Sequence, residues 1–214
     1  MATKMVFFPS SKQLYENQLI NFVYTNGYST QTKFKNINTL HLALTESSDK
    51  LKPLEVSSHS NSSLGVSLSA FNLKYNFSKG LFPIESIYQS SKVFEDNSQY
   101  EHILSWSPLD AKKFIRTINK RIISFKLENK SYPIIPSTVF YDWIYLRAIK
   151  QNLNLMNFLL DFNAFTDIEF NHEKSINCQA RSCAIFVSLV SQNKIKKIDD
   201  FNDFVTLYDE ISLF

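Results

Sequence analysis

The scarcity of glycine is the feature that most narrows the folds open to this chain. Only Gly27, Gly65 and Gly80 occur among its 214 residues. Nucleotide-binding loops of the Walker A and Rossmann types need several closely spaced glycines, because their backbone must approach the phosphate groups directly. A glycine loop that grips phosphate is therefore excluded. A phosphate group must instead be bound by side chains or by the N-terminus of a helix.

The composition predicts one globular unit. Hydrophobic residues make up 44% of the chain and charged residues 20%, and the apolar residues are spread along its whole length. Such a chain is too hydrophobic to be disordered, and its length permits one substantial core. The net charge of +3 permits an anionic ligand without requiring one, because no block of lysine and arginine dominates.

The cysteines and the N-terminus bear on the cellular compartment. Cys178 and Cys183 lack a CxxC pair or a supporting histidine cluster, so we expect buried, reduced thiols and no structural zinc. The first residues are interrupted by Lys4, Pro9 and Lys12, and no apolar run reaches the length of a membrane span. We therefore expect a cytoplasmic protein without a membrane partner, a metal or a cofactor.

The first part of the chain combines strands with a short helix. Aromatic and β-branched runs within residues 4–30 predict strands, with Asn26-Gly27 as a tight turn. Four apolar residues favour a short helix, namely Ile37, Leu40, Leu42 and Leu44. The Ser/Asn-rich residues 57–65 predict a polar loop and the best internal boundary. This boundary divides the chain into an N-terminal extension, residues 1–55, packed on a core domain of residues 56–214.

Beyond residue 65 the pattern is mostly helical. Residues 66–77 predict a strand that leads into a turn at Lys79-Gly80. Pro83 and Ser107-Pro108 mark the starts of two helices, expected over 84–95 and through 109–125. The remaining expected elements are a buried helix over 139–162 capped by Ser137 or Thr138, an extended segment at 164–171, and helices over 177–193 and 199–214. The expected fold is mainly α with a small β component, an α+β fold.

Glu85, Gln89 and Lys92 fall on one face of the helix expected over 84–95. A helix advances about 100° per residue, which places the three side chains within roughly 60° of one another. Polar residues at these spacings most often form a solvated face. The alternative is that an acid, an amide and a base converge on a ligand.

Two other polar groups have the same two interpretations. The segment "FTDIEFNHEKSINCQARS", residues 165–182, is either a surface loop or a loop that lines a binding site. Its Asp167, Glu169 and His172 have too few further ligands beside them for a metal site. A basic stripe is either a solvated face or a nucleic-acid contact; it comprises Lys112, Lys113, Arg116, Lys120 and Arg121. Phe140 and Tyr141 could stack on bases, although core packing is commoner for such aromatics.

The order of these motifs resembles that of the NADAR superfamily (NAD- and ADP-ribose-associated). The family pattern is a Ser/Phe/Asn turn, Glu-x3-Gln-x2-Lys, a proline segment leading to arginine, and an aspartate loop with a later asparagine. The corresponding segments are "SAFNL" at 69–73, "ESIYQSSK" at 85–92, "SPLDAKKFIR" at 107–116 and "FTDIEFNHEKSINCQA" at 165–180. The combination of "QTKFKNINTLH", "LEVSSHSNSSLGVSLSAFNL" and "FTDIEFNHEKSINCQARS" looks like the subgroup found as antitoxin partners of DarT-type toxins, which attach ADP-ribose to guanine in DNA.

The resemblance implies an ADP-ribose-binding α-helical fold with a small β component. It also implies hydrolysis of the N-glycosidic bond between ribose C1 and the modified base. Its motif positions assign catalysis to Glu85, Lys92 and Asp167. They assign ADP-ribose binding to Asn72, Gln89, Arg116 and Asn177, with Lys112 or Lys113 beside Arg116 at the diphosphate. Many members place a tryptophan before the long helix, and this chain has no clear counterpart to it, so base stacking would be by Phe140 or Tyr141. A second departure is "IEFNHEKSI", which stands where many members have a Gly-rich segment between the loop aspartate and the asparagine.

Two mechanisms stay open. Cleavage builds positive charge at C1, which a carboxylate stabilises while a general base activates water, and Glu85 and Asp167 are the candidates for these tasks. Alternatively Lys92, with its pKa lowered by burial, attacks the opened ribose aldehyde and forms a Schiff base.

The leading hypothesis is a glycohydrolase that removes ADP-ribose from guanine in single-stranded DNA, as antitoxin to a DarT-type toxin. One alternative keeps the N-glycosidase chemistry and acts on a small ribosylated metabolite, such as a riboflavin-pathway intermediate. Another is a non-catalytic protein that sequesters the toxin or binds ADP-ribose. Binding to DNA would weaken steeply with salt, whereas binding to a small metabolite would not.

Overall fold

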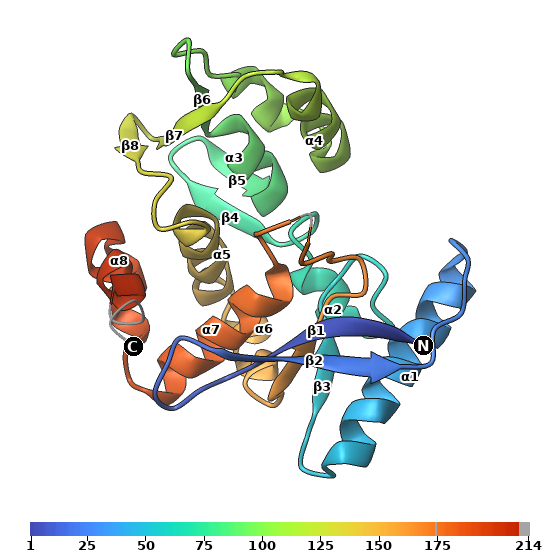
Figure 1. The fold of residues 1–214 in the computed structure, drawn as a ribbon. Helices are drawn as coiled ribbons and strands as arrows, with labels where there is room; N and C mark the ends of the chain where they lie inside the picture. Colours follow the sequence, from blue (N-terminus) through green and yellow to red (C-terminus); the bar gives the residue numbers. More distant parts are fainter. Residues whose placement is uncertain (174, 210–214) are drawn as a thin grey trace.

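The N-terminal hairpin and a strand from the far end of the chain form the main sheet. The computed structural model describes residues 1–173 and 175–209 (Figure 1). β1 (Ala2–Phe8) pairs antiparallel with β2 (Glu16–Phe22), and its other edge pairs at Phe7 with Phe165 of β9 (Ala164–Thr166). β3 (Pro53–Glu55) runs parallel to β9, which gives the strand order β2-β1-β9-β3.

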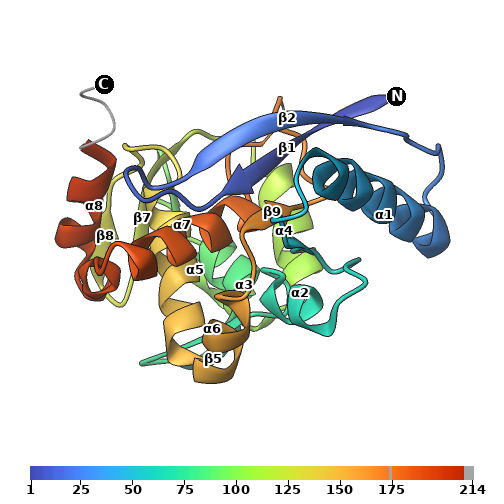
Figure 2. The same ribbon diagram turned by 90° about the horizontal axis from the view of Figure 1, so that it is seen from below.

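Successive residues of β1 face opposite sides of this sheet. Val6 packs with α1 (Thr30–Ser47), whereas Phe7 enters the larger core, because side chains alternate along a strand. α1 begins after Ser29, whose Oγ accepts a hydrogen bond from Thr32 N at 3.1 Å. Its buried face repeats at helical spacing, with Ile37, Leu40 and Leu44. Figure 2 shows α1 lying beside the hairpin, while α7 (Gln179–Ser191) runs beneath it.

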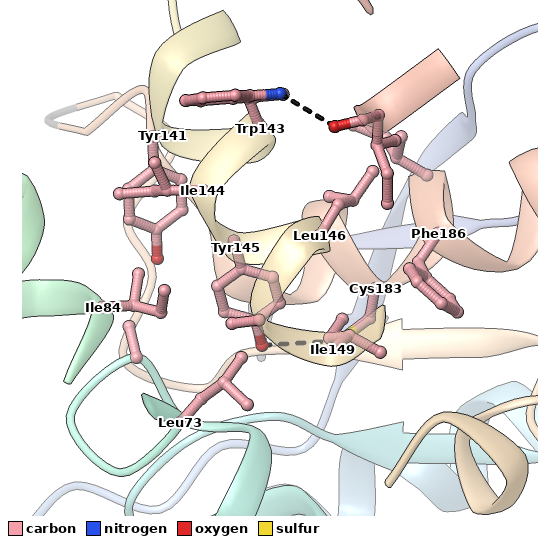
Figure 3. Packing of buried hydrophobic residues seen from close by; sticks show 14 of the residues in the cluster. Leu73, Ile84, Tyr141, Trp143, Ile144, Tyr145, Leu146, Ile149, Cys183 and Phe186 are labelled. Carbon is pink, nitrogen blue, oxygen red and sulfur yellow. Dashed lines mark hydrogen bonds between the residues drawn. The ribbon is translucent and has the colours of Figure 1, made fainter. Parts of the chain in front are cut away.

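α5 (Val139–Gln151) is the central helix of the larger core. It contacts α7, α8 (Phe201–Asp209) and the 3-10 helix η2 (Ile195–Asp199). Trp143 Nε1 donates to the Ile198 carbonyl at 3.0 Å (Figure 3). The Tyr145 hydroxyl donates to the Leu68 carbonyl and lies 3.5 Å from Cys183 Sγ. Cys178 and Cys183 are buried free thiols, which confirms the expectation for them.

A second group of elements carries Glu85. α2 (Ser63–Leu68) leads into the hairpin of β4 (Lys74–Phe77) and β5 (Gly80–Pro83), which is followed by α3 (Ile84–Ser90). An antiparallel sheet then forms from β6 (Lys92–Phe94), β7 (Ile122–Leu127) and β8 (Lys130–Tyr132). Between β6 and β7 lie the 3-10 helix η1 (Glu101–Ser105) and α4 (Pro108–Thr117), both packed on α3.

The α+β class is confirmed, but several boundaries differ from the sequence predictions. The N-terminal hairpin turns within residues 9–15, and Asn26-Gly27 lies instead between β2 and α1. The strand expected over 66–77 begins only at Lys74, because residues 66–68 belong to α2. The helix that follows Pro83 ends at Ser90, where the chain enters β6 and pairs with β7.

Two long helices expected from the sequence are each divided. The segment 109–125 is helical only to Thr117, and residues 122–125 lie in β7. The segment 139–162 breaks at Asn152, whose Oδ1 accepts from Leu155 N at 3.2 Å and caps α6 (Leu153–Leu159). Thr138 precedes α5 but makes no side-chain capping bond. The prediction that the last helix reaches residue 214 falls partly outside the described residues.

Within the described part of the chain, no helix combines the length and the apolar character needed to cross a bilayer.

A buried ion pair joins the C-terminal helices to α5. Asp142 is fully buried and accepts hydrogen bonds from Arg181 Nη2 at 2.9 Å, Ser182 Oγ at 2.5 Å and the Tyr208 hydroxyl at 2.7 Å. Arg181 also donates from Nη1 to the Ile176 carbonyl at 2.7 Å. The pair therefore ties α5, α7 and α8 to the loop that precedes α7.

Replacing Asp142 should be strongly destabilising, because Arg181 would be left as a buried, uncompensated charge. We expect Asp142→Ala to lower the free energy of unfolding by about 3 to 5 kcal/mol, measured by urea denaturation. Lys150→Ala is the matched control, since it removes an exposed ion pair with Asp199 and should cost less than about 1 kcal/mol. Equal losses in the two variants would contradict this account.

Candidate functional site

Glu85, Gln89 and Lys92 form one hydrogen-bonded chain of buried side chains. Gln89 Nε2 donates to Glu85 Oε1 at 2.8 Å, and Lys92 Nζ donates to Gln89 Oε1 at 2.7 Å. Lys92 lies on β6 and not on the helix expected over 84–95, yet its side chain returns to the same face. The three residues are all buried, so the interpretation as a solvated face is wrong.

The start of α3 is held by the turn that carries the "SAFNL" motif. Ile84 N donates to the Leu73 carbonyl and Glu85 N to the Ala70 carbonyl, both at 2.9 Å. These bonds satisfy N–H groups that a helix leaves free at its first turn. They also fix the position of Glu85, the first-turn acid of α3, relative to the turn at residues 69–73.

Two cations of α4 lie near this hydrogen-bonded chain, one at each end. Lys112 Nζ lies 3.3 Å from Glu85 Oε1 and 5.2 Å from the centre of the Phe71 ring. Arg116 is exposed one helical turn further on and faces Lys92 closely enough to repel its positive charge. The basic stripe is therefore divided, because Lys120 pairs with Asp96 and Arg121 lies 3.9 Å from Glu95.

Lys92 has an unusually acidic ammonium group. Burial lowers its pKa to about 8; the negative charge of Glu85 opposes this shift, and the positive charges of Lys112 and Arg116 add to it. Its Nζ also lies 4.7 Å from the centre of the Tyr88 ring. A lysine with such a pKa is partly neutral at physiological pH, which is the state that can act as a nucleophile or base.

Asp167 occupies the turn that follows β9. Its Oδ1 accepts from the backbone N–H groups of Glu169 at 3.0 Å and Phe170 at 3.2 Å, and its Oδ2 accepts from Gln179 Nε2 at 3.1 Å. Burial, followed by the charge of Glu55, raises the pKa of Asp167 to about 7, against the opposing effects of the Glu169 N–H, Lys4 and Gln179. A carboxyl group with a pKa near 7 is suited to proton transfer at neutral pH.

Gln179 connects the two candidate acids. Its Oε1 accepts from Ala70 N at 2.8 Å, while its Nε2 donates to Asp167. The same Ala70 accepts the backbone N–H of Glu85. Ala70 and Gln179 lie 109 positions apart in the sequence, and their contact links the backbone of Glu85 and the carboxylate of Asp167 to the same turn at residues 69–73.

The aromatic residues divide between the site and the core. The Tyr141 ring meets the Tyr88 ring edge-on at 5.3 Å, and burial, followed by the charge of Glu85, raises the pKa of the Tyr141 hydroxyl well above its usual value. Phe140, the neighbouring residue on α5, points elsewhere and stacks on Phe125 at 4.6 Å. Tyr141 therefore borders the site, whereas Phe140 belongs to the core.

Asn177 and Asn72 lie at the periphery. The Asn177 amide faces the Tyr88 hydroxyl, whose pKa burial nevertheless raises to about 12. The buried Asn177 Oδ1 has no hydrogen-bond partner among the described residues, which leaves it available to a ligand donor. Asn72 is exposed, and its Nδ2 donates to the Val66 carbonyl at 2.9 Å.

Four contributors were not among the residues assigned from the sequence: Glu55, Tyr88, Lys112 as a partner of Glu85, and Gln179. Tyr88 could have been found from its position inside the Glu-x3-Gln-x2-Lys motif. Glu55 and Gln179 act through contacts that span more than one hundred residues, for which the sequence carries no local signal. Over residues 1–173 and 175–209, no group of three His, Cys, Asp or Glu side chains is arranged to hold a metal ion.

The acidity of Lys92 can be measured directly. After reductive ¹³C-methylation, one lysine NMR signal should titrate near pH 8, below those of the exposed lysines, and it should be missing in Lys92→Arg. Burial also lowers the pKa of Lys4, so the comparison with Lys92→Arg identifies the signal. Arg116→Ala should raise that pKa by removing a repelling charge, whereas Glu85→Gln should lower it. A Lys92 signal that titrates with the exposed lysines would contradict the burial of its ammonium group.

Comparison with known families matched nearly the whole chain. A family model described as DarT1-associated NADAR antitoxin matches residues 2–213. Among curated proteins, none matches the chain. The matched residues include the motifs at 69–116 and 165–180, so the resemblance seen in these motifs is confirmed. They also include the strands and helix of residues 2–55.

Proposed function

The chain belongs to the family of DarT1-associated NADAR antitoxins, and from that premise we propose that it hydrolyses the bond between ADP-ribose and guanine in single-stranded DNA. It would act as antitoxin by reversing the modification that a DarT-type toxin makes. The substrate and the reaction follow from the resemblance of its motifs, and the geometry of the site supports them.

The observation that carries the proposal is the assembly of two buried acids with different surroundings. Glu85 is paired with Lys112 and hydrogen-bonded by Gln89. Among residues 1–173 and 175–209, Asp167 has no ion pair of this kind, and its pKa lies near 7. Paired carboxyl groups with separate roles are what hydrolysis of a glycosidic bond requires.

In the proposed reaction, the bond between C1 and the base nitrogen breaks, and the nitrogen keeps the electron pair. The Glu85 carboxylate stabilises the positive charge that develops at C1. Asp167, in its deprotonated form, takes a proton from water as the water oxygen bonds to C1. The proton can then pass to the departing guanine, which returns Asp167 to its starting state and balances the reaction.

Lys92 offers a second route through the same site. Its neutral amine can add to C1 of the opened ribose and expel the base, and water then hydrolyses the resulting imine. Treatment of the working enzyme with borohydride separates the two routes. Reduction would leave ADP-ribose covalently attached to Lys92 in the amine route and nothing attached in the water route.

The surrounding residues are assigned to the rest of the substrate. Arg116, with Lys112 or Lys113, is placed on α4 where a diphosphate could be bound by side chains alone. We assign Asn72, Gln89 and Asn177 to polar contacts with ADP-ribose. Tyr141, with Tyr88 beside it, is assigned to the base. Phe140 has no part in the proposed site, because its ring is enclosed in the core.

The wild-type protein should release free ADP-ribose from a guanine-ADP-ribosylated single-stranded oligonucleotide and restore the unmodified base. Asp167→Asn and Glu85→Gln should each lower kcat by about 100-fold or more while the substrate still binds. Lys92→Ala should also lower kcat. Asp199→Asn, which removes an exposed carboxylate that pairs with Lys150, is the matched control and should leave kcat unchanged.

An inactive wild type would exclude the DNA substrate, and small ribosylated metabolites would then be the substrates to test. Salt separates these substrates as well, since binding to DNA should weaken as salt rises. Rescue of toxin-expressing cells by a folded Asp167→Asn variant without glycohydrolase activity would instead favour sequestration of the toxin.

The pH profile should identify the group that must lose a proton. If Asp167 is the base, kcat/KM should rise with pH and level off above a pKa near 7, because the protonated acid cannot accept a proton. An ascending limb near pH 8 would instead assign the role to the Lys92 amine. The measurement is a rate profile from pH 5 to 9 at constant ionic strength.

A further inference from the structure

Glu55 is a fully buried acid to which the sequence analysis assigned no role. Its Oε1 accepts hydrogen bonds from Ser57 Oγ at 2.7 Å and from Ile168 N at 2.8 Å, and its Oε2 accepts from Thr166 Oγ1 at 2.6 Å. Burying a carboxyl group costs stability unless hydrogen bonds compensate. Two of these three bonds go to the residues on either side of Asp167.

The sheet explains how Glu55 reaches this position. Glu55 and Thr166 are direct partners in the parallel pairing of β3 with β9, and Val56 N donates to the Thr166 carbonyl at 2.8 Å. β9 ends at Thr166, so Asp167 is the first residue beyond the backbone ladder. Through its side chain, Glu55 of β3 binds the backbone N–H of Ile168, which lies two residues beyond the end of β9.

Two more N-terminal residues hold the same turn. His41 Nε2 lies 2.9 Å from Thr166 Oγ1, and Lys4 Nζ donates to the Phe170 carbonyl at 2.6 Å. β1, α1 and β3 therefore each contribute one side chain to the segment 166–170. The N-terminal 55 residues, which were expected to form an extension, supply these supports.

We propose that Glu55 is a positioning residue, which fixes the carboxylate of Asp167 for catalysis by binding the residues before and after it. The inference rests on the proposed function, in which Asp167 transfers the proton. Glu55 itself touches neither the substrate nor the water. Its effect comes through Thr166 and Ile168, while Gln179 fixes Asp167 from the other side.

The charges that face Asp167 determine what each variant should do. Glu55 raises the pKa of Asp167, whereas Lys4 from β1 and Gln179 from α7 lower it. Other titratable groups nearby are Glu169 in the same turn, Cys178 before α7, Cys183 on α7 and Tyr141 on α5. Burial raises the pKa values of Cys178 and Tyr141 well above their usual values and that of Cys183 to about 12. His41 is neutral at pH 7, because burial lowers its pKa to about 4.

The test compares Glu55→Gln with Glu55→Ala in the full chain, on the ADP-ribosylated oligonucleotide. Gln keeps the shape and can accept from Ile168 N, so this variant should retain most of the wild-type kcat. Burial raises the pKa of Glu55 itself, and in its ionised form its charge raises the pKa of Asp167. The variant removes this charge, so the ascending limb of its pH profile should move below that of the wild type. Ala removes the hold on both flanking residues and should lower kcat per folded molecule by about 100-fold, with KM little changed.

Asn163→Ala is the matched control. Asn163 Oδ1 accepts from Lys52 N at 2.7 Å and its Nδ2 donates to the Lys50 carbonyl at 3.0 Å, so it supports the other end of the same β3 and β9 pair. This variant should lose stability in urea but keep the wild-type kcat and pH profile. Carboxyl-carbon NMR of Asp167 in the wild type and in Glu55→Gln measures the change in the pKa of Asp167 independently of activity. This measurement tests the inference even if Glu55→Ala does not fold.

The failures of the two proposals are distinct. A wild type without glycohydrolase activity overturns the proposed function and the catalytic part of this inference with it. An active wild type overturns the positioning role alone if Glu55→Ala keeps its kcat per folded molecule, if Glu55→Gln keeps the wild-type pH limb, or if Asn163→Ala loses activity as Glu55→Ala does.

Discussion

The side-chain amide of Gln179 is the contact on which the geometry of the site depends. One of its atoms accepts from Ala70, whose carbonyl fixes the backbone of Glu85, and the other donates to Asp167. An amide can do both at once because it carries a donor and an acceptor on one rigid plane. Gln179 is also the first residue of α7, so the helix that packs beneath the main sheet sets the spacing of the two acids.

The polar groups of this region are buried at a cost that the surrounding structure offsets by specific bonds. Glu55, Glu85 and Asp167 are all less than a tenth exposed. Each accepts hydrogen bonds or an ion pair, and for Glu85 and Asp167 the donors lie on α3, α4 and α7. Burial disfavours the charged form of each group, and the nearby opposite charges offset this only in part. The pKa of Asp167 is therefore raised to about 7 and that of Lys92 is lowered to about 8. Stability and reactivity are therefore linked in this part of the chain, since changes that relieve the buried charges also remove the shifted pKa values.

The sequence predicted the α+β class and the convergence of Glu85, Gln89 and Lys92, but the convergence was reached on a partly wrong premise. Helical spacing placed Lys92 on α3, whereas pairing of β6 with β7 takes the chain out of the helix at Ser91, and only the length of the lysine side chain restores the contact. The helix expected over 109–125 failed for the same reason, because pairing with β6 and β8 overrides the helical pattern of residues 122–125. Local periodicity carries no information on such pairings. Gln179 and Glu55 were missed because their partners Ala70 and Ile168 lie more than one hundred residues away in the sequence. Phe140 was named beside Tyr141 as a base-stacking residue because the sequence does not show which of two adjacent helical residues faces the core.

The pairing of Phe7 with Phe165 has a consequence for the timing of synthesis. β9 cannot join β1 until the ribosome has made residues 164–166 of the 214, and α7, which carries Gln179, emerges later still. Contacts of such long range form late and slow the folding of the elements that depend on them. A nascent chain therefore has Glu85 and Lys92 long before it has the turn of Asp167 and its supports. The delay between translation and a complete site is built into the strand order, and it would separate the appearance of the polypeptide in the cell from the appearance of its activity.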